Sequence, residues 1–205
     1  MIRVMTPESF VQTTWSGGTT EEILIDPKGS RYSDRQFLFR ISTAVVDEAS
    51  SEFTKLPGYR RYLMPLSGPL TLFVSGQEVT LAPFEVAAFD GGAATFSQGA
   101  AHLRDLNLMV RATAQGNMVF WAQEAVHLDR GERMVFVILQ VDAKGHFLEI
   151  DRVLDKPKED ELILSLAEDQ RGVLLVVPKE EREAETIDLA GGPTVEEALR
   201  QQLIF

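Results

Sequence analysis

Short apolar segments, separated by turns rich in glycine and proline, constrain the fold of this 205-residue chain more than any other feature. The clearest segment is Phe37–Val45, whose β-branched and aromatic residues favour a strand. Similar segments recur about every 8–12 residues, with turns such as Asp26-Pro27-Lys28-Gly29 between them. Thr194 and Glu197 match a capping box, which predicts a short C-terminal helix through about Gln202. We therefore predict an all-β sandwich or jelly-roll fold with one short helix.

Two glycine-containing stretches predict tight turns. Ser67-Gly68-Pro69 separates the strand-like segments Tyr62–Leu66 and Leu70–Val74, which we expect to pair as a hairpin. Gly17-Gly18 follows Trp15 and lies beside hydroxyl side chains, an arrangement that could cradle a phosphate. A P-loop, however, requires Gly-Lys-Ser/Thr at the start of a helix, and that motif is absent, so we expect a turn or bulge.

The segment His102–Arg111 carries polar and apolar side chains in alternation. Because strand side chains alternate between two faces, Leu106, Leu108 and Val110 share one face. The other face carries a polar row that consists of Asp105, Asn107, Met109 and Arg111. This row is either a solvated sheet surface or one wall of a ligand pocket, and the direction in which it points distinguishes the two.

Two further arginines, Arg40 and Arg61, lie in strand-like or adjoining segments. Half-buried guanidinium groups suit carboxylates, because bidentate pairing supplies both charge and geometry. The residues that could complete such a pocket as polar partners or apolar wall are Trp15, Thr20, Glu22, Ser42, Asp105, Asn107, Met109 and Arg111. The alternative is an internal ion-pair network, for instance Arg111 with Asp105 or Glu22, that shapes the fold without a ligand.

Signatures of covalent or metal-assisted catalysis are missing from the sequence. The chain has no cysteine, and it has no Gly-x-Ser-x-Gly nucleophile elbow. Its three histidines, His102, His127 and His146, form no closely spaced His-x-His pair of the kind that binds metals in many β-barrel enzymes. We therefore predict no catalytic residue, no metal and no cofactor.

The net charge of −11 argues against nucleic acid or an anionic membrane as a partner, since both favour clustered Lys and Arg. Most of the negative charge lies after residue 111, and the first half is nearly neutral. No secretory signal is visible at the N-terminus, and no apolar run approaches the roughly 18 residues of a membrane span. We expect a cytoplasmic protein, in which exposed sheet edges would allow a homodimer.

Five segments in the same order resemble the HutD/Ves family of bacterial cupin proteins. They are Trp15 with Gly18-x-Thr20-x-Glu22-Ile23, Phe39-Arg40-Ile41-Ser42-x-Ala44, Phe53-x-x-Leu56-Pro57-Gly58-x-x-Arg61, Leu81-x-Pro83-Phe84-Glu85, and Asp105-Leu106-Asn107-Leu108-Met109-x-Arg111. The resemblance covers about residues 1–111. It implies a bicupin, in which two jelly-roll β-barrels pack together: a first barrel over residues 1–112 and an acidic second barrel over 113–205, with strand exchange between them allowed.

The resemblance also implies a link, in some bacteria, to histidine utilisation, with a regulatory role through a bound metabolite. Our leading hypothesis is a non-catalytic bicupin that recognises a small carboxylate or amino-acid-like metabolite. A metal-dependent cupin enzyme, such as an isomerase or dioxygenase, is the alternative, and a purely structural or interaction module is the third.

Overall fold

The computed structural model describes residues 1–123, 125–128 and 131–178, and it is all-β over these residues apart from two single-turn 3-10 helices. These turns are η1 (Pro7–Ser9) and η2 (Tyr32–Asp34). The helix expected from Thr194 to Gln202 lies outside the described residues. Within the described part of the chain, no helix has the length and apolar character that crossing a membrane requires.

Four antiparallel sheets contain the strands. The six-stranded sheet has the order β2 (Val11–Trp15), β3 (Gly18–Asp26), β4 (Phe39–Val46), β11 (Leu103–Arg111), β6 (Tyr59–Pro65), β9 (Ala87–Asp90). The four-stranded sheet has the order β5 (Ser50–Glu52), β10 (Thr95–Gly99), β7 (Leu70–Val74), β8 (Gln77–Leu81). The five-stranded sheet has the order β1 (Arg3–Met5), β15 (Phe147–Lys156), β14 (Met134–Val141), β17 (Gln170–Val176), β12 (Asn117–Trp121). A two-stranded sheet pairs β13 (Ala125–Leu128) with β16 (Leu162–Ser165).

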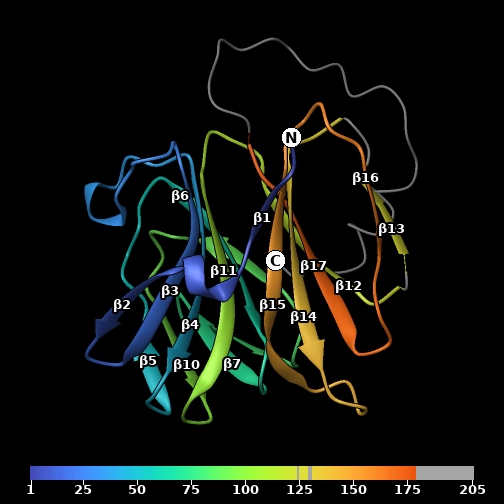
Figure 1. Cartoon of the computed structure of the whole chain (residues 1–205). Helices are drawn as coiled ribbons and strands as arrows, with labels where there is room; N and C mark the ends of the chain where they lie inside the picture. Colours follow the sequence, from blue (N-terminus) through green and yellow to red (C-terminus); the bar gives the residue numbers. More distant parts are fainter. Residues whose placement is uncertain (124, 129–130, 179–205) are drawn as a thin grey trace.

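The six-stranded sheet has an apolar layer against each of its two faces. Phe39, Ile41, Leu106, Leu108 and Val110 pack on the five-stranded sheet, in one cluster with residues such as Val135, Val137, Val153 and Val173. On the opposite face, Leu63 and Leu103 join Leu70, Leu72 and Leu81 of the four-stranded sheet. The sheets of the first half and of the second half thus lie side by side (Figure 1). Each fully buried Leu or Phe contributes roughly 1.5–3 kcal/mol, so these layers provide much of the stability.

The first strand of the chain belongs to the five-stranded sheet, although the rest of that sheet comes from the second half. β1 pairs with β15, in the register Arg3 with Asp155 and Met5 with Val153. Met5 is 3% exposed and is part of the core between the two large sheets. The N-terminal residues therefore connect the two halves of the chain.

The hairpin expected between residues 62–66 and 70–74 does not form. β6 pairs with β11 and β9, whereas β7 pairs with β10 and β8. Ser67-Gly68-Pro69 instead carries the chain from the six-stranded to the four-stranded sheet. The backbone N–H of Leu66 bonds to the Arg104 carbonyl at 2.8 Å, which keeps this crossing close to β11.

The expected turn at Gly17-Gly18 is present, as the connection between β2 and β3. Gly18 has a φ of +154°, and a Cβ placed there would lie 2.0 Å from the Val45 carbonyl oxygen. A residue without a side chain is therefore required at this position.

Candidate functional site

One face of the six-stranded sheet carries the predicted site residues. Residues directly opposite each other in an antiparallel ladder point to the same side. Asn107 lies opposite Ser42 and Leu63, and Met109 lies opposite Arg40 and Arg61. We call this surface the inner face, because its Leu63 packs on the four-stranded sheet. Its site residues are Thr20, Glu22, Arg40, Ser42, Arg61, Asp105, Asn107 and Met109.

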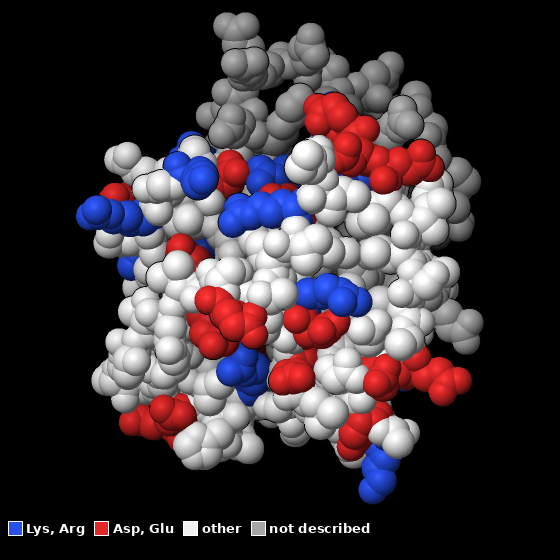
Figure 2. Space-filling model, in the orientation of Figure 1, with Lys and Arg blue, Asp and Glu red and all other residues white. Residues whose placement is uncertain are grey.

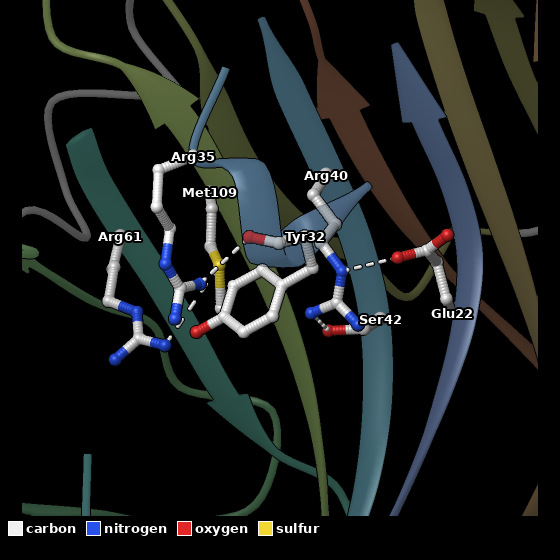
Figure 3. A network of polar contacts seen from close by, with 7 residues as sticks. All are labelled: Glu22, Tyr32, Arg35, Arg40, Ser42, Arg61 and Met109. Carbon is white, nitrogen blue, oxygen red and sulfur yellow. Dashed lines mark hydrogen bonds and ion pairs between the residues drawn. The ribbon is translucent and has the colours of Figure 1, made fainter. Parts of the chain in front are cut away.

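Arg40 is held on the inner face by contacts from its own strand and from β3. Its Nε donates to Glu22 Oε2 at 2.7 Å, and its Nη1 donates to Ser42 Oγ at 3.1 Å (Figure 3). A register irregularity between Glu22 and Leu24 lets β3 place Glu22 opposite Ser42 and then return to the pairing of Ile25 with Arg40. The ion-pair network considered as an alternative is thus realised for Arg40, with Glu22 as its partner.

Arg61 has a different environment. It is 4% exposed, and its guanidinium lies 5.2 Å from the centroid of the Phe53 ring. Its polar contacts are weak: Nη1 lies 3.4 Å from the Thr54 carbonyl, and Nη2 lies 3.9 Å from the Met109 sulfur. Arg61 Nε has no hydrogen-bond partner, and no carboxylate lies within ion-pairing distance of this guanidinium among the described residues.

Two unpartnered acceptors lie on the same inner face. Asp105 and Asn107 are 4% and 7% exposed, and Oδ1 of each has no hydrogen-bond partner among the described residues. Burial raises the pKa of Asp105 to about 7, although the Arg61 and Arg104 charges and a hydrogen bond from the Ala44 backbone all act to lower it. An unpaired buried polar group costs about 1–3 kcal/mol. These groups therefore point to a role other than stability.

Tyr32 and Arg35 also belong to the site, although sequence reasoning did not select them. They come from η2 and the residue that follows it. The Tyr32 ring lies next to the Arg35 and Arg40 guanidiniums, whose Cζ atoms are 3.8 and 4.5 Å from its centroid (Figure 3). Arg35 adopts a left-handed conformation with a φ of +54° and donates from Nη1 to the Tyr32 carbonyl. No local motif in the sequence marks these two residues as part of a site.

Two of the predicted residues, Trp15 and Arg111, lie at the border of the inner face. Trp15 is 38% exposed at the edge strand β2, and its Nε1 donates to Thr20 Oγ1 at 3.1 Å. Arg111 is half-buried at the end of β11, opposite Tyr59. Met109 is 3% exposed and packs with Phe37, Leu56 and Tyr59, so it forms an apolar wall beside Arg61.

A cleft of about 240 Å³ opens between the edge strands β8 and β9. Its lining includes Val74, Val79, Ala87 and Phe89, with Arg60 among its polar residues. Phe89 lies opposite Arg61 on the neighbouring strand, and its ring contacts Phe53 edge-on.

Acidic and basic side chains are interspersed on the molecular surface seen in Figure 2. On that face, Lys and Arg side chains do not gather into one basic area of the kind that nucleic acids require. The two arginines of the inner face, Arg40 and Arg61, are a separate feature, because both are buried.

Comparison with known proteins identifies the family. The HutD family model matches residues 7–178, which is most of the chain. The chain belongs to the HutD family. No curated protein matches it. Among solved structures, HutD from Pseudomonas fluorescens SBW25, determined in a formate condition, is 23% identical with a TM-score of 0.68, and the match covers 86% of this chain and 97% of that one.

Two further solved structures place the HutD fold among cupin-like proteins. A conserved protein of unknown function from Pseudomonas aeruginosa PAO1 is 22% identical, with a TM-score of 0.72 and coverage of 86% and 98%. The bacterial pirin YhhW from Escherichia coli, in complex with nickel(II), is 9% identical, with a TM-score of 0.59 and coverage of 87% and 99%. At these identities the likeness shows the fold: an all-β, cupin-like architecture.

In the described part of this HutD family member, the residues do not fit a metal site of the usual cupin kind. Among the described residues, no group of three or more His, Asp or Glu side chains is placed to hold a metal ion. The three histidines are exposed, and their rings contact Asp47, Glu161 and Asp142 respectively. None of them lies on the inner face beside Arg40 and Arg61.

Proposed function

We propose that this protein is a non-catalytic bicupin that binds a small carboxylate or amino-acid-like metabolite on the inner face of its first barrel. In this proposal the four-stranded and six-stranded sheets form the first barrel, and the remaining sheets form the second. Arg61 is the main anion-binding group. Arg40 and Arg35 complete the cationic side of the site, and the Tyr32 ring lies beside both of their guanidiniums. Binding serves a regulatory role, which family membership connects with histidine utilisation.

The Arg61 environment carries the proposal. A guanidinium that is 4% exposed has lost nearly all of its hydration, yet its Nε lacks a hydrogen-bond partner. A buried cation without a counter-ion is costly, and in most proteins a carboxylate compensates it. A bound carboxylate would accept hydrogen bonds from Nε and one Nη of Arg61, in the bidentate geometry that guanidinium groups favour.

The neighbouring groups support a ligand that is more than a simple anion. Arg40 keeps Glu22 as its partner, so the pair is close to neutral and leaves the net positive charge at Arg61 and Arg35. Met109 and Phe53 provide an apolar surface beside Arg61. The unpartnered Oδ1 atom of Asn107 would accept a hydrogen bond from an N–H group, as an amino-acid-like ligand offers.

Ligand-dependent thermal stabilisation tests this function. The panel begins with formate, the smallest carboxylate, and extends to histidine-pathway intermediates and to uncharged analogues of similar size. We expect at least one carboxylate to raise the melting temperature of the wild-type protein, because a ligand that binds only the folded state stabilises it by mass action. The Arg61→Met variant should lose this response.

Arg60→Met is the matched control. Arg60 is adjacent to Arg61 in β6 but points to the opposite side of the strand and is exposed. It should respond to the ligand as the wild type does. If no carboxylate shifts the melting temperature, or if Arg61→Met and wild type respond equally, the proposed function is wrong.

A further inference from the structure

Asp105 and Arg61 lie in one buried interior and carry opposite charges without forming an ion pair. They come from adjacent strands, β11 and β6, and each is 4% exposed. In the ladder between these strands Arg61 lies opposite Met109, and Asp105 lies opposite Pro65. Their Cα atoms are therefore separated by about four residues along the strands, or roughly 13 Å.

The Arg61 guanidinium is the strongest attractive charge that acts on Asp105. It is first among the groups that lower the pKa of this carboxyl, ahead of Arg104. Burial lowers the pKa of Arg61, and the Arg40 and Arg35 charges act in the same direction, whereas Tyr32 and Asp105 act to raise it. The charge state of one residue thus influences the other across the interior.

Few other charged groups face the Asp105 carboxyl. Around the small cavity that Asp105 lines, β10 contributes Ser97, β7 contributes Leu70, and the connection after β4 contributes the exposed Glu48. From β4 the nearest contribution is the Ala44 backbone N–H, which donates to the carboxylate. Arg104 lies on β11 itself, points to the other side of the strand and pairs with Glu21 at 2.9 Å.

We infer that Arg61 and Asp105 form a proton-linked pair, in which an anion bound at Arg61 drives uptake of a proton from solvent by the Asp105 carboxylate. This inference rests on the proposed function. A carboxylate at Arg61 neutralises the guanidinium and adds a negative charge to the same interior, so both effects favour the neutral form of Asp105. The only bond that forms is the O–H bond of the Asp105 carboxyl, and the proton comes from water.

The consequence is a ligand affinity that depends on pH around neutrality. Because the pKa of Asp105 in the free protein is about 7, and because anion binding raises it, the bound state carries more protons than the free state in the interval above 7. Affinity should therefore be greatest below pH 6 and fall as pH rises. A rise of one unit in the pKa of Asp105 on binding corresponds to a fall in affinity of about tenfold. The site would release its ligand in a more alkaline solution.

The test follows the Asp105 carboxyl directly by NMR of carboxyl-labelled protein between pH 5 and 9. It compares the wild type, Arg61→Met, Arg61→Lys and Arg60→Met, and the wild type with saturating formate. We expect a midpoint near 7 in the wild type, as burial predicts. The midpoint should be clearly higher in Arg61→Met and close to the wild-type value in Arg61→Lys and Arg60→Met, because these two keep the charge at position 61.

The outcomes separate the inference from the proposed function. If Asp105 does not titrate in this interval, or if its midpoint is equal in the wild type and Arg61→Met, the proton-linked pair is wrong. If formate binds without moving the midpoint, the coupling to ligand is wrong while the binding function stands. If formate and the rest of the panel fail to bind, the proposed function is wrong, and the Arg61 variants alone decide whether the pair exists.

Discussion

Replacing Asp105 by Asn should stabilise the protein, and the gain should depend on pH. In the folded protein the pKa of Asp105 is about 7, whereas its ordinary value is 3.8. Between these two values the folded state holds a proton that the unfolded state has released. With respect to this group, stability is therefore highest below about pH 4, falls as pH rises from about 4 to about 7, and levels off above that.

The size of the effect follows from the difference between the two pKa values. Each unit is worth about 1.36 kcal/mol, so ionisation of Asp105 lowers the free energy of unfolding by up to about 4 kcal/mol at pH 8. Asn has nearly the same shape as the neutral carboxyl group and carries no charge. Asp105→Asn should thus exceed the free energy of unfolding of the wild type by about 1 kcal/mol at pH 4.5 and by about 4 kcal/mol at pH 8.

Urea denaturation at pH 4.5, 6, 7 and 8 measures this difference, with fluorescence or circular dichroism as the signal. Asp90→Asn is the matched control, because Asp90 is exposed at the end of β9. Its difference from the wild type should stay within about 0.5 kcal/mol at every pH. A gain for Asp105→Asn that is equal at pH 4.5 and pH 8, or no gain at any pH, would refute the assignment of a buried, titrating carboxyl.

Two further predictions concern the connection between the halves and the first hairpin. Arg133 donates to Asp26 of β3 at 2.7 Å and to Asp155 of β15 at 3.1 Å. The substitution Arg133→Met leaves these two largely buried carboxylates without their cation. It should lower the free energy of unfolding, measured by urea denaturation, by about 3 kcal/mol. The control Arg152→Met removes a half-exposed arginine with a 3.5 Å contact and should cost less than 1 kcal/mol; equal losses would contradict the role of Arg133. Gly18→Ala places a Cβ against the Val45 carbonyl and should lower the melting temperature markedly, whereas Gly68→Ala, whose Cβ meets its nearest atom at 4.0 Å, should leave it nearly unchanged. A Gly18→Ala protein as stable as the wild type would refute the close approach.

Sequence alternation predicted the two faces of β11 well. Leu106, Leu108 and Val110 lie in the core between the two large sheets, and Asp105 and Asn107 lie on the inner face. Successive side chains of a strand point to opposite faces, so the sequence alone assigns these residues to two separate faces. The alternation could not say whether the polar row faced solvent or the interior. That depends on the four-stranded sheet, whose β5 and β10 carry few apolar residues and were not expected as strands.

Contacts between distant segments were beyond prediction from the sequence. The sequence suggested an ion pair between Arg111 and Glu22, but the partner of Glu22 is Arg40. The irregularity in β3 causes this, because it aligns Glu22 with Ser42, which is two residues from Arg40. Tyr32 reaches Arg40 only through the fold of the turn that precedes β4. Likewise, residues 67–69 looked like a hairpin turn, yet they connect two sheets, since the pairing of β6 with β11 is decided by residues some forty positions away.

The two strands that carry most of the site, β4 and β11, are neighbours in the middle of the six-stranded sheet, and both of their faces are covered. Backbone amides in such strands exchange with solvent only when the whole domain opens. The side chains of Arg40 and Asn107 are therefore attached to a rigid part of the backbone. For a ligand, these side chains would be preorganised. If binding is accompanied by backbone movement, we expect that movement in the edge strand β2 and in the turn that carries Tyr32. A rigid central pair of strands with more mobile elements at the edge of the site would favour selective binding with little loss of conformational entropy.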